Sequence, residues 1–340
     1  MKKLTFTFIL FSLFVFTACD NSLSINTEWK ERTVVYAIFD PGDSISYIRV
    51  TKAFLGEGNI LAMAKERDSS EYKNISVTLE KYFNKKHVKT YVFEPTEIDG
   101  KEDGTFYNPY QTVYAAVTHN ELDAIYTSDT TYTYKVQIIN NSKDTVGKSM
   151  PLISNRFTLI TPFTPSSSTP TITFPHSGIN ETRLEWYKVE NGYIYNVSAE
   201  IEILETLSNR DSVMRIISWD NIFNFVSEDV DLIQKKIPSM NFFYMMLARV
   251  PHKDAEKENL VVKRQIRDFT LVFKIGTKDY HDYVTGFASS GLNMDMPVYS
   301  NFENGIGIIT SRVTHTRKCI LSDRTNAALI YEPAYEHLKF

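Results

Sequence analysis

The strongest constraint on the fold of this chain is an alternation of apolar and polar residues with a period of two. From Tyr193 to Ile201 almost every second residue is apolar, which is the pattern of a half-buried strand. Thr33–Phe39 is a further strand run, rich in β-branched and aromatic residues, and after a Pro-Gly turn at 40–44 the segment Ser46–Lys52 returns with alternating faces. The pattern predicts antiparallel hairpins.

Two further hairpins are predicted before residue 160. One pairs Ile75–Leu79 with Val88–Phe93, and the other begins at Tyr132–Ile138 and returns toward Leu152. Evenly spaced hairpins without long helices between them are typical of an antiparallel β-sandwich. The Tyr-x-Tyr-x-Val pattern at 132–136 is similar to a late strand of immunoglobulin- and fibronectin-type domains. A short helix is predicted at 59–65.

The length of 340 residues allows two domains of ordinary size. The clearest break is 161–170, where three prolines stand among Ser and Thr residues that do not build a core. We therefore predict a mainly β fold with an α+β C-terminal half. Its parts are a sandwich domain at 29–160, a Pro/Ser/Thr linker at 161–175 and a second β-rich domain with a few helices at 176–340.

The second half combines predicted strands and helices. A helix is predicted at 227–237, because Ser227 is a good N-cap and the apolar residues that follow share one helical face: Val230, Ile233 and Ile237. A strand at 266–275 and a helix from Tyr280 that ends at Gly291 are predicted next.

The first twenty residues have the pattern of an export signal. Two lysines precede the apolar run Leu4–Phe16, which is shorter than the roughly 20 residues that cross a bilayer. The following Thr-Ala-Cys resembles the lipobox of bacterial lipoproteins, in which the cysteine thiol takes a diacylglycerol and the new amine takes an acyl chain such as palmitate. The resemblance implies a signal peptide at 1–18, lipidation of Cys19 and a tether at 19–28. An ordinary secretory signal with a chance cysteine is the alternative.

Charge and thiol content limit the remaining possibilities. A formal charge of −4 gives no electrostatic basis for binding nucleic acid, which requires clustered Lys and Arg. Once Cys19 is lipidated, Cys319 is the only thiol, so no disulfide within the chain is expected. We expect Cys319 to be a buried, inert thiol.

The segment 297–308 reads Pro-Val-Tyr-Ser-Asn-Phe-Glu-Asn-Gly-Ile-Gly-Ile. It resembles the closing motif of a Bacteroidota lipoprotein group, domain-of-unknown-function family 4249, and the order of the preceding parts is also similar. The resemblance implies a cell-envelope lipoprotein, often encoded beside TonB-dependent outer-membrane transporters, and it brings no catalytic residues. Gly305 and Gly307 lack the Lys-Ser/Thr of a phosphate-binding loop, so a backbone bend next to a strand is the preferred interpretation.

Few residue patterns indicate chemistry. The seven histidines have no metal-ligand spacing, and no recognised nucleotide, calcium or hydrolase motif occurs. His281 and Asp282 form the most suggestive pair, but neighbours on a helix do not face each other, which favours a solvated helix face. The acidic group at 228–231 fits calcium or, preferably, a helix N-terminus. We predict no cofactor, no metal and no catalytic site.

Four Asp-Ser/Thr-apolar tripeptides resemble the O-glycosylation sequon of Bacteroidota envelope proteins. The candidate acceptors are Ser44, Thr130, Thr145 and Ser212. Asp and Ser are also ordinary turn formers, which is the alternative explanation.

Together these observations favour a lipid-anchored binding or accessory module, held at the outer membrane and working beside a transporter or another envelope protein. Two alternatives stay open. One is an envelope hydrolase whose acid and base come from distant loops, and the other is a structural component of a surface assembly.

Overall fold

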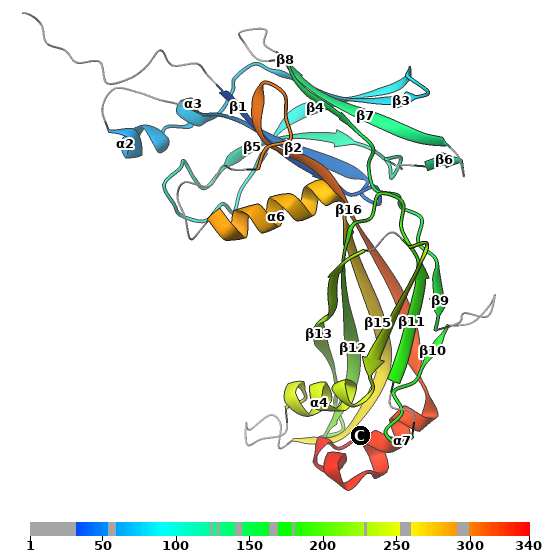
Figure 1. Ribbon diagram of the computed structural model, residues 1–340. Helices are drawn as coiled ribbons and strands as arrows, with labels where there is room; N and C mark the ends of the chain where they lie inside the picture. The colour runs from blue at the N-terminus through cyan, green and yellow to red at the C-terminus, as the bar shows by residue number, and fades with distance from the viewer. Residues whose placement is uncertain are drawn as a thin grey trace, which may run out of the picture. The chain divides into compact units, whose positions relative to one another are not determined.

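The computed structural model describes residues 32–53, 59–122, 125–127, 130–139, 145–162, 169–178, 181–227, 230–251, 260–290 and 299–340. These residues form a mainly β structure with one large mixed sheet and a second sheet of three strands (Figure 1). Within the described ranges, no helix is long and apolar enough to span a bilayer.

The elements divide into those before and after residue 155. The first group comprises β1 (Arg32–Phe39), β2 (Ile45–Ala53), α2 (Ile60–Ala64), α3 (Arg67–Ser70), β3 (Ser76–Phe83), β4 (Lys86–Ile98), β5 (Gln111–Val117), β6 (Ile125–Thr127), β7 (Thr130–Ile139) and β8 (Thr145–Met150). The second group comprises β9 (Leu159–Thr161), β10 (Thr171–Ile172), β11 (Glu181–Tyr187), β12 (Ile194–Leu207), β13 (Ser212–Val226), β14 (Leu232–Pro238), α4 (Met240–Arg249), β15 (Val261–Gly276), α6 (Lys278–Ser290), β16 (Gly305–Leu321), α7 (Asp323–Tyr331) and the 3-10 helix η1 (Pro333–Leu338).

One long strand joins the two groups. The large sheet has the order β13-β12-β15-β16-β1-β2-β5-β4-β3-β7-β6, with β8 paired to β7 and β10 paired to β16. Residues 305–311 of β16 pair in parallel with β1, and residues 312–319 pair antiparallel with β15. A single sheet therefore runs through segments from both halves of the chain.

The three hairpins predicted from the sequence are confirmed. They are the antiparallel pairs β1–β2, β3–β4 and β7–β8. The predicted helix at 59–65 is also confirmed as α2, where the Asn59 side chain accepts hydrogen bonds from the backbone N–H groups of Leu61 and Ala62. The predicted strand and helix that follow residue 260 are β15 and α6.

The first hydrophobic cluster lies within the curled part of the large sheet. Residues 86–93 of β4 pair with β3, and residues 94–98 pair with β5, so β4 takes part in two stretches of the sheet. The rings of Phe39 on β1 and Phe93 on β4 lie 6.4 Å apart, although two strands separate β1 from β4 in the sheet order. The sheet thus curves until residues on distant strands pack against each other.

The second cluster lies between the large sheet and the sheet β14-β11-β9. Trp186 of β11 is fully buried, and its ring contacts Tyr195, Phe225 and Phe273 on three strands of the large sheet. Aromatic side chains bury large areas, so these contacts contribute much of the packing between the sheets. The alternation predicted for β12 is confirmed, because its inward residues are buried: Tyr195, Val197, Ala199 and Ile201.

The predicted linker includes residues that pack. Ile172 and Phe174 are buried in the second cluster, and β10 pairs with β16. Residues 163–168 lie outside the described part of the chain. A division of the chain near 161–170 therefore stays a prediction.

The predicted helix at 227–237 is wrong. Residues 232–238 form β14, which pairs antiparallel with β11. Ile233 and Ile237 are buried, and a spacing of four places two residues on one face of a strand as well as of a helix. Lys235 lies between them with its ammonium 3.8 Å from the Phe225 ring centroid, so a polar residue in this position is compatible with a strand.

Candidate functional site

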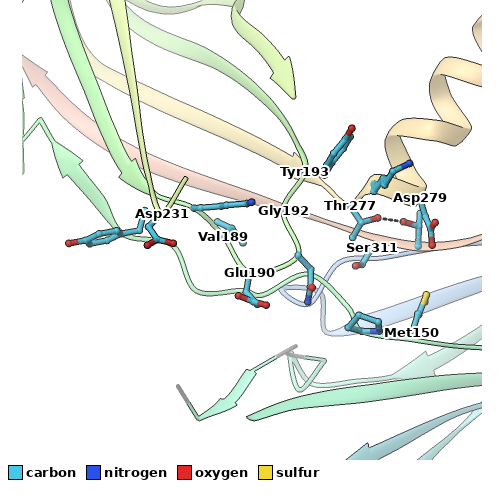
Figure 2. A pocket seen from close by; sticks show the side chains of 15 residues that line it. Met150, Val189, Glu190, Gly192, Tyr193, Asp231, Thr277, Asp279 and Ser311 are labelled. Atoms are coloured by element: carbon cyan, nitrogen blue, oxygen red, sulfur yellow. Dashed lines mark hydrogen bonds between the residues drawn. The ribbon is translucent and has the colours of Figure 1, made fainter. Parts of the chain in front are cut away.

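One pocket lies beside the turn that joins β11 to β12, and we name it the junction pocket. It has a volume of about 720 Å³ and is lined by residues 150–151, 187–193, 231, 277–279 and 310–311. Figure 2 shows that Tyr193, Thr277 and Ser311 approach this pocket from different segments of the chain. Its lining is largely polar, which suits hydrogen bonding to a polar ligand.

The turn that forms one wall is held by specific contacts. Asn191 has a φ of +62°, and its side-chain amide donates to the Leu152 carbonyl at 2.8 Å. The Tyr195 hydroxyl accepts a hydrogen bond of 2.9 Å from the Val189 N–H. Burial raises the pKa of Tyr195 to about 12, so this phenol is neutral at ordinary pH. Tyr195 is therefore part of the support for the turn.

Asp279, at the start of α6, lines this pocket and accepts hydrogen bonds from three other side chains. Its carboxylate accepts hydrogen bonds from Lys148 at 2.9 Å, Tyr299 at 2.7 Å and Asn301 at 2.9 Å. Burial tends to raise the pKa of Asp279, but these three donors outweigh that effect and hold it below its usual value. Asp279 is a hydrogen-bonded carboxylate and not a poised base.

Asn301, which belongs to the closing segment 297–308, has a structural role. Its side-chain amide donates to the Ile309 carbonyl at 2.8 Å, and its side-chain oxygen accepts from the Ile309 N–H at 3.0 Å. The side chain thus pairs with β16 as a neighbouring backbone would, and it also reaches Asp279. The segment connects α6 to the strand shared by both halves of the chain.

The Thr277, Thr310 and Ser311 hydroxyls of the junction pocket already form hydrogen bonds within the protein. Thr277 and Thr310 share a hydrogen bond of 2.5 Å, and Ser311 accepts from the Ile153 N–H at 2.7 Å. A serine or threonine nucleophile requires a base within hydrogen-bond reach. These contacts with threonine and backbone groups serve the packing of β16 and α6.

The expectation that His281 and Asp282 do not face each other is wrong. His281 Nδ1 lies 3.2 Å from Asp282 Oδ1, and the His281 ring packs edge-on against Tyr193 of the junction pocket. Burial tends to raise the pKa of Asp282, but the hydrogen bonds from Lys278 and His281 lower it by more. The pKa of Asp282 therefore lies below its usual value. Both side chains are about one quarter exposed, with values of 25% and 28%. Both side chains are thus partly buried rather than on a fully solvated face, and neither lines the junction pocket.

The other predicted site residues are distributed over the chain. Cys19 lies outside the described residues, as do Glu228 and Asp229, whereas Asp231 lines the junction pocket. Cys319 is buried as predicted, and burial raises the pKa of its thiol to about 12, which leaves it unreactive. Among the described side chains, no group of three or more His, Cys, Asp or Glu is arranged to hold a metal ion.

The four candidate acceptors for O-glycosylation occupy turns and strand ends. Ser44 is exposed in the β1–β2 turn and donates to Asn120 at 3.1 Å, and Ser212 is exposed at the first position of β13. Thr130 and Thr145 begin β7 and β8, and their side chains lie outside the described part. Modification at these sites stays a prediction.

A second pocket lies on the outer face of the β1–β2 pair, and we name it the hairpin pocket. It has a volume of about 580 Å³ and is lined by residues 34, 36, 49, 51–53, 60, 61, 64, 70, 71, 101 and 105–107. Sequence reasoning missed it, because its residues come from four separate segments.

Strand alternation explains the floor of the hairpin pocket. Residues 35, 37 and 39 of β1 and residues 48 and 50 of β2 enter the first hydrophobic cluster. The opposite face therefore presents Val34 opposite Thr51 and Tyr36 opposite Arg49. The roof is α2, which is tied to segment 101–107 by a hydrogen bond of 3.0 Å from the Tyr107 N–H to the Ala64 carbonyl.

Apolar side chains around the hairpin pocket stay exposed. The exposed fractions are 50% for Ile60, 63% for Leu61 and 51% for Phe106. Tyr36 on the floor is 37% exposed, and its ring also contacts Tyr283 of α6. This pocket therefore combines apolar walls with open access to solvent.

No protein-family model matches this chain, and no curated protein is significantly similar to it.

Proposed function

We propose that this chain is a lipid-anchored cell-envelope protein whose folded body binds a ligand with an apolar part. The observation that carries the proposal is the hairpin pocket, a cavity of about 580 Å³ ringed by exposed apolar side chains. A ligand that covers such side chains gains about 25 cal/mol for each Å² of apolar surface removed from water. Concave apolar surfaces of this size are typical of ligand sites.

The predicted lipid on Cys19 supports this function by its place in the chain. The segment between Cys19 and β1 can span at most about 45 Å. Val34, near the start of β1, already lines the hairpin pocket. The tether therefore keeps the pocket close to a bilayer, where apolar and amphiphilic molecules are concentrated.

The proposal includes membership in the lipoprotein family that the closing segment resembles. It also includes a transporter or another envelope protein as the partner. The envelope hydrolase and the structural component of a surface assembly stay as alternatives. An immunoglobulin- or fibronectin-like sandwich at 29–160 is likewise proposed. Its support is the set of antiparallel hairpins and the contact between Phe39 and Phe93.

Binding of a neutral apolar dye such as Nile red tests the proposed function. We expect the mature chain with Cys19→Ser to bind the dye at one site and 1-hexadecanol to displace it. Leu61→Asp should weaken dye binding at least tenfold, because it removes apolar contact and places a charge beside the ligand.

Ile216→Asp is the matched control. Ile216 on the edge strand β13 is 61% exposed and Leu61 is 63% exposed, so the two substitutions change the surface to a similar degree. The control variant should bind the dye within about twofold of the parent chain. Equal losses in the two variants, or no saturable binding at all, would contradict the proposal.

A further inference from the structure

The hairpin pocket contains three cationic side chains besides its apolar walls: Arg49, Lys52 and Lys101. In the part of the chain that the structure describes, none of the three forms an ion pair with a carboxylate. The Lys101 ammonium donates to the Tyr107 carbonyl at 2.7 Å, and the Lys52 ammonium lies 5.9 Å from the Tyr72 ring centroid. Their positive charge is therefore available to an anion in the pocket.

Among the described residues of the lining, Glu71 is the only carboxylate, and it bonds to Arg67 and Thr112. It accepts hydrogen bonds of 2.7 Å from Arg67, 3.0 Å from the Thr112 N–H and 2.6 Å from the Thr112 hydroxyl. Its burial raises its pKa, but these donors outweigh that effect and hold the pKa below its usual value. Glu71 forms its ion pair with Arg67 and acts on Lys101 only as a nearby negative charge, so it offsets the positive charge of the three lining cations only in part.

Two of the cations repel each other. Burial lowers the pKa of Lys101, and the nearby positive charge of Arg49 lowers it further. Arg49 and Lys101 reach the pocket from different elements, β2 and the segment between β4 and β5. An anion that contacts both groups replaces this repulsion with two attractions, and a guanidinium fork can hold a carboxylate through two hydrogen bonds.

We propose that the hairpin pocket binds a single-chain amphiphile with an anionic head, and specifically a long-chain carboxylate. The head contacts Arg49 and Lys101, and the aliphatic chain lies against the apolar wall of Val34, Ile60, Leu61 and Phe106. The cavity of about 580 Å³ falls within the common range for ligand pockets of about 300–1,000 Å³. This inference rests on the proposed function and adds the charge of the ligand to it.

A comparison of palmitate with 1-hexadecanol tests the inference, because the two molecules share a chain and differ in the charge of the head. Their affinities are measured by dye displacement on the mature chain with Cys19→Ser. We expect palmitate to bind at least tenfold more tightly than 1-hexadecanol. Lysophosphatidylglycerol, which carries a phosphate head, should bind less tightly than palmitate.

Variants identify the groups that recognise the head. The double substitution Arg49→Gln and Lys101→Gln should reduce the ratio of palmitate affinity to 1-hexadecanol affinity to about twofold. The affinity for 1-hexadecanol should stay within about twofold of that of the parent chain. The unchanged affinity for the alcohol shows that the variant is folded. Lys188→Gln, which removes a cation from the junction pocket, should keep the full preference for palmitate.

The outcomes separate this inference from the proposed function. Equal binding of acid and alcohol, or a preference that survives the double substitution, would overturn the anionic-head inference and leave an apolar-ligand module in place. Tighter binding of lysophosphatidylglycerol would overturn the choice of a carboxylate. Failure of every probe to bind would overturn the proposed function itself, and the inference with it.

Discussion

Gly307→Ala is expected to destabilise the folded body by about 2–5 kcal/mol, which combines a left-handed backbone penalty with overpacking. Gly307 has a φ of +114°, and a Cβ at this position would lie 2.0 Å from the Val35 carbonyl oxygen. The contact lies where β16 pairs with β1, so an added methyl group would force the two strands apart. Urea denaturation followed by circular dichroism measures the loss.

Gly100→Ala separates the two causes of this effect. Gly100 also has a positive φ, +80°, but a Cβ there meets no atom within 4 Å. We expect a loss of about 1–2 kcal/mol from the backbone alone. Similar unfolding midpoints for the two variants would show that the contact with Val35 is not the main constraint at Gly307.

Cys19→Ser is expected to abolish membrane anchoring. The substitution removes the thiol that would accept diacylglycerol, and each buried methylene of an acyl chain contributes about 0.8 kcal/mol to membrane binding. The protein should then appear as unprocessed precursor or in the soluble fraction. Fractionation of cells followed by immunoblotting measures the distribution.

Cys319→Ala provides the control for this experiment. Cys319 is buried in the second hydrophobic cluster, and its thiol has no part in anchoring. This variant should stay in the membrane fraction together with the parent protein. Membrane association of Cys19→Ser at the level of the parent would show that the N-terminal segment is not a lipoprotein signal.

The fold was predictable where hydrophobic periodicity is local. The inward residues of β12 and the hairpins of the first half follow directly from period-two alternation, because one face of each strand meets a core. Turn residues such as Pro41 and Gly42 then mark where the chain reverses. The strands of these hairpins and β12 could therefore be predicted from the sequence.

Two elements required tertiary information. A helix and a strand both place Ile233 and Ile237 on one side. The pairing of β14 with β11 shows that this segment is a strand. β16 contributes Ile309 to the first cluster and Val313 to the second. Nothing local in the segment 305–321 indicates that a strand has different partners along its length, so the continuity of the large sheet could not be predicted.

The candidate sites were less predictable than the fold. Arg49, Leu61 and Lys101 are ordinary surface residue types at distant positions, and only the packing of α2 and segment 101–107 over β1 and β2 brings them together. The exclusion of the His281–Asp282 contact used ideal helix geometry and ignored the freedom of side-chain torsions. Sites assembled from several segments leave no motif in the sequence.

Hydrogen–deuterium exchange with and without 1-hexadecanol tests most directly whether the hairpin pocket is the binding site. The mature chain with Cys19→Ser is saturated with the ligand, and exchange is followed by mass spectrometry. Amides at 60–64 and 101–107 should exchange several-fold more slowly with ligand, because α2 and its neighbouring segment form the roof of the pocket. Amides at 188–193 beside the junction pocket should not change. Protection at 188–193 without protection at 60–64 would contradict the assignment.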